Sequence, residues 1–156
     1  MTALALVVIA RDEARCIGRC LESARPLVDR MIVLDTGSRD DTAAIAAACG
    51  AEVHHFRWCD DFAAARNAAL AQSGAQWNLV LDADEWIDGA GAATALRGAI
   101  AAAAPFVGLL PVASEFDVRG RVEVALSWIP RLLPAGLRYQ GRTHEEPESA
   151  LPRRRI

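Results

Sequence analysis

The sequence predicts an α/β fold with a mainly parallel, Rossmann-like sheet and helices on both faces. Short apolar runs bounded by polar residues recur along the first half, and segments of helical periodicity separate them. Strands that alternate with helices of ten to fifteen residues form βαβ units with right-handed crossovers. The chain has 156 residues. A chain of this length is expected to fold as one domain with a proper core.

Composition narrows the class of protein. Apolar residues make up 53% and charged residues 24% of the chain, as in soluble globular proteins. The net charge of -3 gives no electrostatic case for nucleic-acid binding. The basic cluster Arg153-Arg154-Arg155 is interpreted as a frayed tail.

No segment has the pattern of a membrane or export signal. Residues 1–10 are too short for a signal peptide and lack a basic start. The apolar run 99–113 is broken by prolines and is too short to span a bilayer. We therefore expect a cytoplasmic protein without a transmembrane segment, and peripheral membrane contact stays open.

The expected elements follow the apolar periodicity. In the first half, strands are expected at 4–10, 31–34, 52–58 and 77–82, with helices around 17–24, 43–49 and 60–74. In the second half, the sequence favours an alanine-rich helix at 89–104 and strands at 106–112, 122–133 and 137–141. Cys16, Cys20, Cys49 and Cys59 form no C-x-x-C pair, so reduced cysteines are expected rather than a zinc site.

Charged residues follow the predicted strands at one edge of the sheet. Arg11 and Glu13 follow the first strand, Asp35 ends the second, and Asp82 and Asp84 follow the fourth. The carboxyl ends of parallel strands lie together, and open α/β sheets bind ligands there. These side chains are therefore expected to converge on a single crevice.

The chemistry of that crevice is constrained by its charges. Neither a G-x-G-x-x-G nor a G-x-x-x-x-G-K-[ST] segment is present, so the sequence supports neither dinucleotide binding nor P-loop phosphate binding. Carboxylates repel phosphate directly, but they hold it through a divalent cation. Arg66 adds a candidate direct phosphate contact. The implied ligand is a metal-bound diphosphate.

Four segments resemble motifs of family-2 glycosyltransferases and occur in the same order. They are 33–42 (V-L-D-T-G-S-R-D-D-T), 60–67 (D-D-F-A-A-A-R-N), 79–85 (L-V-L-D-A-D-E) and 141–145 (G-R-T-H-E). The resemblance implies a GT-A fold and transfer of a sugar from a nucleotide-diphosphate donor, usually with inversion. Residues 1–88 would then form the nucleotide-sugar-binding half, and 89–156 a shortened acceptor-side half.

The resemblance also assigns roles to donor-binding residues. Ala10, Arg11 and Glu13 would border the nucleotide pocket, and Asp35 would contact the base, which is usually uracil. Arg66 would lie near the base or the diphosphate.

The D-x-D segment and the last motif would complete the donor site. Asp82 would face the ribose or the metal, Ala83 would belong to the nucleotide-sugar site, and Asp84 would ligate Mn²⁺ or Mg²⁺. His144 resembles the late residue that completes the metal shell in related enzymes. The metal ligands expected from the resemblance are thus Asp82, Asp84 and His144.

The catalytic base of an inverting transfer must be a carboxylate near the acceptor. Glu145 and Glu115 are both candidates, and Glu145 is preferred because it neighbours His144. The acceptor is a saccharide, a lipid or a protein.

Simpler roles are expected for several other polar and aromatic residues. Asp40, Asp41, Asp60 and Asp61 read as helix caps. Asn67 reads as a packing and hydrogen-bonding residue, and Trp77, Trp86 and Trp128 as core or pocket wall. His54 and His55 are expected to be structural, in a strand away from the functional edge.

Two other functions compete with transfer, and the sequence departs from the family pattern in three ways. Asp12 replaces a common asparagine, 130–134 lacks a phenylalanine and a second arginine, and the chain ends soon after Glu146. One alternative is a non-catalytic nucleotide-sugar-binding module, a degenerate glycosyltransferase that retains only the pocket. The other alternative is a phosphatase of the haloacid dehalogenase type. Its D-x-D normally continues to Thr or Val, whereas Glu85-Trp86 follows here.

Overall fold

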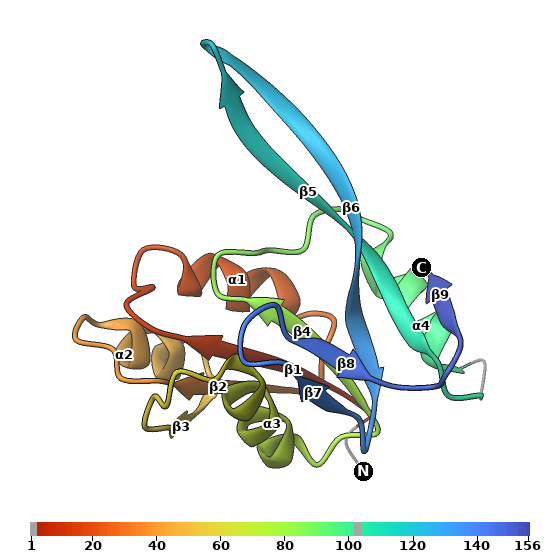
Figure 1. Ribbon diagram of the computed structural model, residues 1–156, viewed down its shortest axis with the longest axis horizontal. Helices are drawn as coiled ribbons and strands as arrows, with labels where there is room; N and C mark the ends of the chain where they lie inside the picture. Colours follow the sequence, from red (N-terminus) through yellow and green to blue (C-terminus); the bar gives the residue numbers. More distant parts are fainter. Residues whose placement is uncertain (1–2, 102–103) are drawn as a thin grey trace.

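One mixed sheet of seven strands organises the chain, whose computed structural model describes residues 3–101 and 104–156 (Figure 1). Its strand order is β3-β2-β1-β4-β6-β5-β9. The strands are β1 (Leu4–Ala10), β2 (Arg30–Asp35), β3 (Glu52–His55), β4 (Trp77–Asp82), β5 (Val107–Val118), β6 (Arg121–Pro134) and β9 (Arg153–Arg155). A separate two-stranded sheet pairs β7 (Arg138–Gln140) with β8 (Glu146–Glu148).

Helices cover both faces of the sheet, as predicted. They are α1 (Ile17–Ala24), α2 (Thr42–Ala48), α3 (Phe62–Ser73) and α4 (Ala92–Ala101). One core cluster joins the sheet to α1, α2 and α4, while a second joins its other face to α3 and β7. Helix α1 buries the four residues that recur at helical spacing, and α3 ends where Gly74 adopts a left-handed conformation.

The register of the parallel strands brings their carboxyl ends together. Ala10 at the end of β1 aligns with Asp35 of β2, and Ile9 aligns with Asp82 of β4. The predicted parallel pairing of the first four strands is therefore confirmed. Strand β6 then runs antiparallel to β4, pairing Leu132 with Leu79, so both halves of the chain share one sheet.

Strands β5 and β6 continue past the sheet as a two-stranded arm, residues 110–129 (Figure 1). At its tip, Arg119 and Gly120 both have positive φ, as a two-residue hairpin turn requires. The strands pair with β4 and β9 only near their base, through Leu132–Pro134 and Val107–Leu109. The sequence predicted both strands but ended the first near Val112, several residues too early.

The prediction of a frayed basic tail at Arg153–Arg155 is wrong. These residues form β9, which pairs in parallel with the start of β5. Their guanidinium groups also lie over aromatic rings, Arg154 over Phe106 at 4.7 Å and Arg155 over Trp128 at 4.8 Å. Main-chain pairing does not depend on side-chain charge, and the rings attract the cations.

The expectations for the end of β3 and for the length of α4 need correction, and the expectation of no transmembrane segment can be compared with the described helices. Strand β3 ends at His55, so this histidine lies at the functional edge, aligned with Asp35, and not away from it. Helix α4 is shorter than the expected 89–104, of which residues 102–103 lie outside the described chain. Within the described part, no helix has the length and apolarity needed to cross a membrane.

Candidate functional site

A cleft of about 550 Å³ opens at the carboxyl edge of the parallel strands. Its walls come from the ends of β1 and β4, from the loops after β1, β2, β3 and β4, from α3 and from the loop before β8. The lining residues are Ile9, Ala10, Arg11, Glu13, Thr36, Trp58, Phe62, Arg66, Asp82, Ala83, Asp84 and Glu145. Open α/β sheets bind ligands at this edge.

Most of the predicted donor-site residues meet in this cleft, but three of the predicted site residues do not line it. Asp35 is buried, and its carboxylate accepts the Ser38 N–H at 3.1 Å and lies 3.4 Å from Nδ1 of His55. His144 is exposed and lies next to the lining residue Glu145. Glu115 is exposed on the arm.

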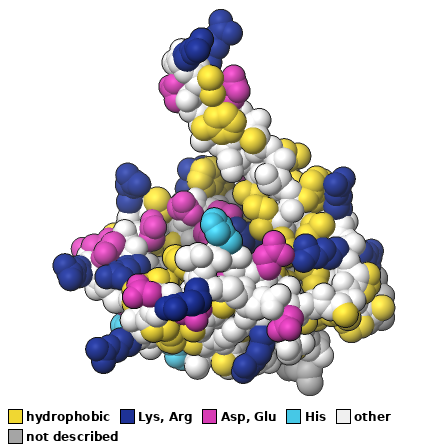
Figure 2. Space-filling view, viewed as in Figure 1, with side chains coloured by type: hydrophobic (Ala, Val, Ile, Leu, Met, Phe, Trp, Pro, Cys, Tyr) yellow, Lys and Arg dark blue, Asp and Glu magenta, His cyan; other side chains and the backbone are white. Residues whose placement is uncertain are grey.

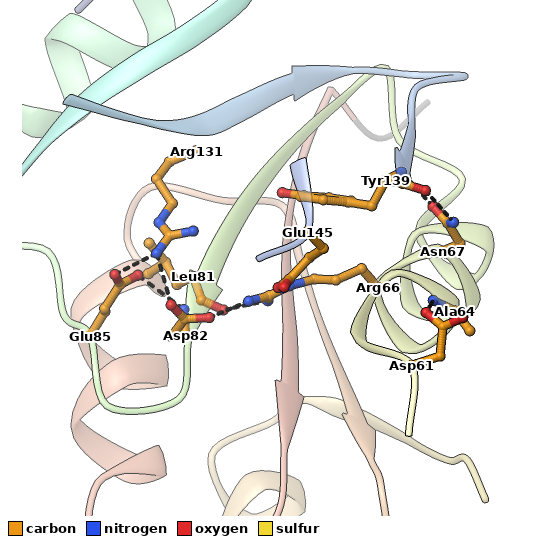
Figure 3. A network of polar contacts seen from close by, with 10 residues as sticks. All are labelled: Asp61, Ala64, Arg66, Asn67, Leu81, Asp82, Glu85, Arg131, Tyr139 and Glu145. Carbon is orange, nitrogen blue, oxygen red and sulfur yellow. Dashed lines mark hydrogen bonds and ion pairs between the residues drawn. The ribbon is translucent and has the colours of Figure 1, made fainter. Parts of the chain in front are cut away.

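Asp82 is bound by two arginines from opposite sides of the site (Figure 3). Nη2 of Arg66, on α3, contacts Oδ1, and Nη2 of Arg131, on β6, lies 2.8 Å from Oδ2. Burial alone would raise the pKa of the Asp82 carboxyl. The two nearby cations outweigh it, and the pKa lies below the usual range. Asp82 is therefore held as a carboxylate.

Arg66 is 4% exposed, and its guanidinium forms hydrogen bonds with oxygen atoms of the protein. Besides Asp82, its Nε donates to Oε1 of Glu145 at 3.2 Å and its Nη1 to the carbonyl of Leu81 at 3.4 Å. Burial lowers the pKa of Arg66, and the charges of Asp82 and Glu145 more than restore it. A buried arginine thus joins the end of β4 to the loop that carries His144.

Glu85 and Arg131 complete this network, although the sequence analysis assigned no role to either. Nη2 of Arg131 lies 2.6 Å from Oε1 of Glu85, and Oε2 of Glu85 accepts the N–H of Asp82 at 3.0 Å. The one available signal was an arginine inside the otherwise apolar run 128–134. Asp84 differs from its neighbours, because it contacts no other described residue through a hydrogen bond or ion pair.

Helix α3 fixes the loop that presents His144 and Glu145. The Asn67 amide binds both backbone groups of Tyr139, donating to its carbonyl at 2.9 Å and accepting its N–H at 2.8 Å. The N–H of Phe62 donates to the carbonyl of Arg142 at 3.0 Å. These contacts join the D-D-F-A-A-A-R-N segment to the chain just before and within G-R-T-H-E, and they confirm the hydrogen-bonding role of Asn67.

His144 has a φ of 56°, a conformation that costs energy in a residue other than glycine. Within the described chain, no three His, Cys, Asp or Glu side chains lie close enough to hold a metal ion together. Asp84 nevertheless offers a free carboxylate in the cleft, close in space to the loop of His144. Such a donor set suits a cation that takes its other ligands from substrate phosphates.

Trp58 and Phe62 form an aromatic wall of the cleft that the sequence analysis missed. Their rings meet edge to face, with centroids 4.8 Å apart. Asp60 accepts the indole N–H of Trp58 at 2.9 Å, so its predicted role as a helix cap is wrong. Asp61 does cap α3, accepting the Ala64 N–H at 2.9 Å. Neither aromatic residue stands out from sequence periodicity, because Trp58 lies in the loop between β3 and α3 and Phe62 is the first residue of α3.

The remaining predicted caps and aromatic residues do not line the cleft. Asp40 accepts the Thr42 N–H at the start of α2, whereas Asp41 makes no capping bond from its side chain. Trp77 packs in the core against Phe106, and Trp86 is exposed beneath the guanidinium of Arg19. All four cysteines are free.

Residues 5–117 match the profile of the glycosyl transferase family 2. The chain belongs to this family. Its sheet and helices are those of a GT-A glycosyltransferase, as the resemblance implied. The family match and the position of D-x-D after the fourth strand leave the phosphatase alternative without support.

Two curated relatives contain a similar segment within longer chains. A TPR repeat-containing protein of Synechococcus elongatus is 55% identical over 85 residues, which cover 54% of this chain and 21% of that protein. The glycosyltransferase SunS of Bacillus subtilis is 34% identical over 80 residues, covering 49% and 19%. The chain thus spans about a fifth of the length of these relatives.

Solved structures of glycosyltransferases share the fold. The glucosyl-3-phosphoglycerate synthase of Mycobacterium tuberculosis in complex with UDP has a TM-score of 0.58 and 26% identity, covering 70% of this chain and 43% of that one. TarS of S. aureus in complex with UDP-GlcNAc has a TM-score of 0.61 and 21% identity, covering 76% and 36%. The second likeness concerns the fold alone.

Proposed function

We propose that this family-2 chain forms the donor-binding centre of a cytoplasmic enzyme that transfers a sugar from a UDP-linked donor to a saccharide, lipid or protein acceptor. The observation that carries the proposal is the carboxylate of Asp84, which forms no ion pair with a described residue and lines the cleft beside Asp82 and Glu145, both paired with Arg66. The related synthase is known in complex with Mn²⁺ and UDP, which supports the same ligands here.

The nucleotide is proposed to lie against the end of β1. Ala10, Arg11 and Glu13 line this part of the cleft, and Asp35 orders the adjacent loop by accepting the Ser38 N–H. Arg11 supplies the positive charge on that wall, which suits a phosphate or the polar edge of a base. We propose that Asp35 marks the base end of the pocket.

The diphosphate is proposed to lie beside Asp84. Asp84 and His144 would hold Mn²⁺ or Mg²⁺, with Asp82 and Ala83 at the ribose or the inner side of the cation. The cation, when bound, neutralises charge on the departing diphosphate. Arg66 adds a positive charge from beneath the cleft, although its N–H groups already bind protein oxygens.

For an inverting transfer, a carboxylate takes the proton of the acceptor hydroxyl during its attack on the anomeric carbon. We propose Glu145, because it lines the cleft with a side chain that is 15% exposed. Its Oε1 lies 3.2 Å from Nε of Arg66. Glu115 is the weaker candidate, since it extends from the arm and does not line the cleft.

Donor hydrolysis with several UDP-sugars and Mn²⁺ tests this proposal. Release of UDP by the wild-type protein, lost in Asp84→Ala and kept in Asp117→Ala on the exposed arm, supports a transferase. Donor binding without turnover across saccharide, lipid and peptide acceptors supports the non-catalytic module instead. Hydrolysis of a phosphomonoester without any donor binding would contradict both.

A further inference from the structure

The three carboxylates of the acidic turn, residues 82–85, are treated differently by the fold. Asp82 and Glu85 are both bound to Arg131, whereas Asp84 has no such partner among the described residues. Glu85 also closes the turn, because Oε2 accepts the Asp82 N–H and its own N–H donates to the Asp82 carbonyl, both at 3.0 Å. Like charges this close repel one another unless cations lie between them.

Arg131 lies behind the cleft and does not line it. It is 8% exposed and stands on β6 next to Leu132, the residue that pairs with Leu79 of β4. Figure 3 shows its guanidinium above the carboxylates of Asp82 and Glu85, on the side away from Arg66. Because of this position, it acts on a bound ligand through other residues.

We propose that Arg131 is a positioning residue, which draws Asp82 and Glu85 back against β6 and leaves Asp84 as the carboxylate of the acidic turn that meets the cation and diphosphate. This inference rests on the proposed function for the ligand, but the shape of the turn is testable without it. Arg131 also connects the base of the arm directly to the donor site, because it stands on β6 and binds Asp82.

The contacts predict which substitution retains this effect. A single nitrogen, Nη2, makes both ion pairs, at 2.8 Å to Asp82 and 2.6 Å to Glu85. The flat fork of arginine is therefore not required, and the single ammonium of lysine can bridge the same oxygens. Arg131→Met keeps the length and apolar stem but removes the charge. Arg97→Met is the matched control, because it removes an exposed arginine paired with Asp29 far from the turn.

The first experiment measures hydrogen exchange of the peptide that contains residues 82–87 in the ligand-free protein. We expect exchange to quicken about tenfold or more in Arg131→Met and to return to within about threefold of the wild type in Arg131→Lys. Arg97→Met should leave it unchanged. Wild-type protection in Arg131→Met would overturn the proposal, and so would equal loss in the Lys variant.

The second experiment measures Mn²⁺ affinity in the presence of saturating UDP by calorimetry. Loss of a residue that orients metal ligands lowers metal affinity about 10- to 100-fold, so Arg131→Met should fall in that range. Arg131→Lys should recover most of it. Unaltered Mn²⁺ affinity in a Met variant whose turn exchanges faster would overturn the functional part of the inference.

The two proposals fail in different ways. If the wild-type protein binds neither UDP nor Mn²⁺, the proposed function fails, while hydrogen exchange still decides whether Arg131 shapes the turn. If Arg131→Met does not fold, Glu85→Gln serves as the milder variant. It keeps an oxygen for the Asp82 N–H but weakens the pair with Arg131. Faster exchange at 82–87 would support the proposal, and unchanged exchange would contradict it.

Discussion

The parallel half of the sheet and the arm both consist of strands rich in apolar residues. These residues are mostly buried in the parallel half and mostly exposed on the arm. Every residue of β1 except Ile9 is buried, whereas Val122, Val124 and Leu126 of the arm are 70%, 62% and 61% exposed. Charges show the reverse pattern, since buried arginines pair with acids beside the cleft while acids and arginines of the arm face solvent (Figure 2). Similar strand sequences therefore acquire different roles from what covers them.

The arm depends more than the parallel half on contacts with other parts of the chain for its stability. A two-stranded hairpin is marginally stable alone, and exposed apolar surface of this kind is uncommon on isolated domains. Figure 2 shows apolar side chains along the arm and basic ones at its tip. Its stability therefore comes from its base, where β6 pairs with β4 and β5 pairs with β9.

Two leucines on the same strand give the sharpest test of this difference. Leu132 is fully buried where β6 joins the sheet, and Leu126 is exposed on the arm. Leu132→Ala should lower the free energy of unfolding by about 3 kcal/mol, because it leaves a cavity. Leu126→Ala should change it by less than about 0.5 kcal/mol. Urea denaturation measures both, and equal effects would show that the arm is buried in solution.

Removing a buried charge near the cleft should have the second largest effect on the free energy of unfolding. Arg66→Met removes a cation from between Asp82 and Glu145 and should cost about 2 kcal/mol of unfolding free energy. This lies below the usual cost of breaking a buried pair, because Asp82 retains Arg131 and its side chain is 41% exposed. Arg121→Met on the arm is the control, with no expected change beyond about 0.5 kcal/mol. If Arg66→Met left the free energy of unfolding unchanged, that result would contradict a structural role for this arginine.

The pH dependence of stability should reflect Asp82. Its pKa is lower in the folded than in the unfolded protein, so its contribution is fully present above about pH 5. That contribution is lost as the pH falls below about 4, through the folded pKa. The stability difference between wild type and Asp82→Asn should therefore be constant from pH 5 to 7 and shrink in acid. An unchanged difference at pH 3 would contradict the lowered pKa.

The smallest effect concerns thiol reactivity. Burial, together with the charges of Glu85 and Asp82, raises the pKa of Cys20 to about 12, whereas Cys59 is exposed. At pH 9, roughly one thousandth of Cys20 would be thiolate, so an alkylating reagent should modify Cys59 and spare Cys20. Mass spectrometry of the alkylated protein measures this. Early labelling of Cys20 would show that the acidic turn above it opens.

Local patterns in the sequence predicted the parallel half well. The run Leu4–Ala10 and the helical spacing in Ile17–Ala24 specify their elements, and strand ends specify the edge on which Arg11, Asp82 and Asp84 meet. What the sequence did not reveal depends on partners distant in the chain. Arg131 lies 49 residues from Asp82, and β9 pairs with the start of β5.

Two site residues illustrate the same limit within a motif. The V-L-D-T-G-S segment specifies where Asp35 lies but not that its carboxylate turns to the Ser38 N–H and away from the cleft. The D-x-D segment specifies Asp82 and Asp84 but not that arginines from two elements bind only the first. Side-chain direction is set by packing and long-range charge, which a local pattern does not contain.

The central claim is that Asp84 is the free metal-binding carboxylate of a UDP-sugar site. Calorimetry of UDP with and without Mn²⁺, on wild type and Asp84→Asn, tests it most directly, with GDP as the competing nucleotide and Asp117→Asn as the control. We predict UDP binding that Mn²⁺ strengthens at least tenfold in the wild type and in Asp117→Asn but not in Asp84→Asn. Equal Mn²⁺ enhancement in Asp84→Asn, or no UDP binding by the wild type, would contradict the claim.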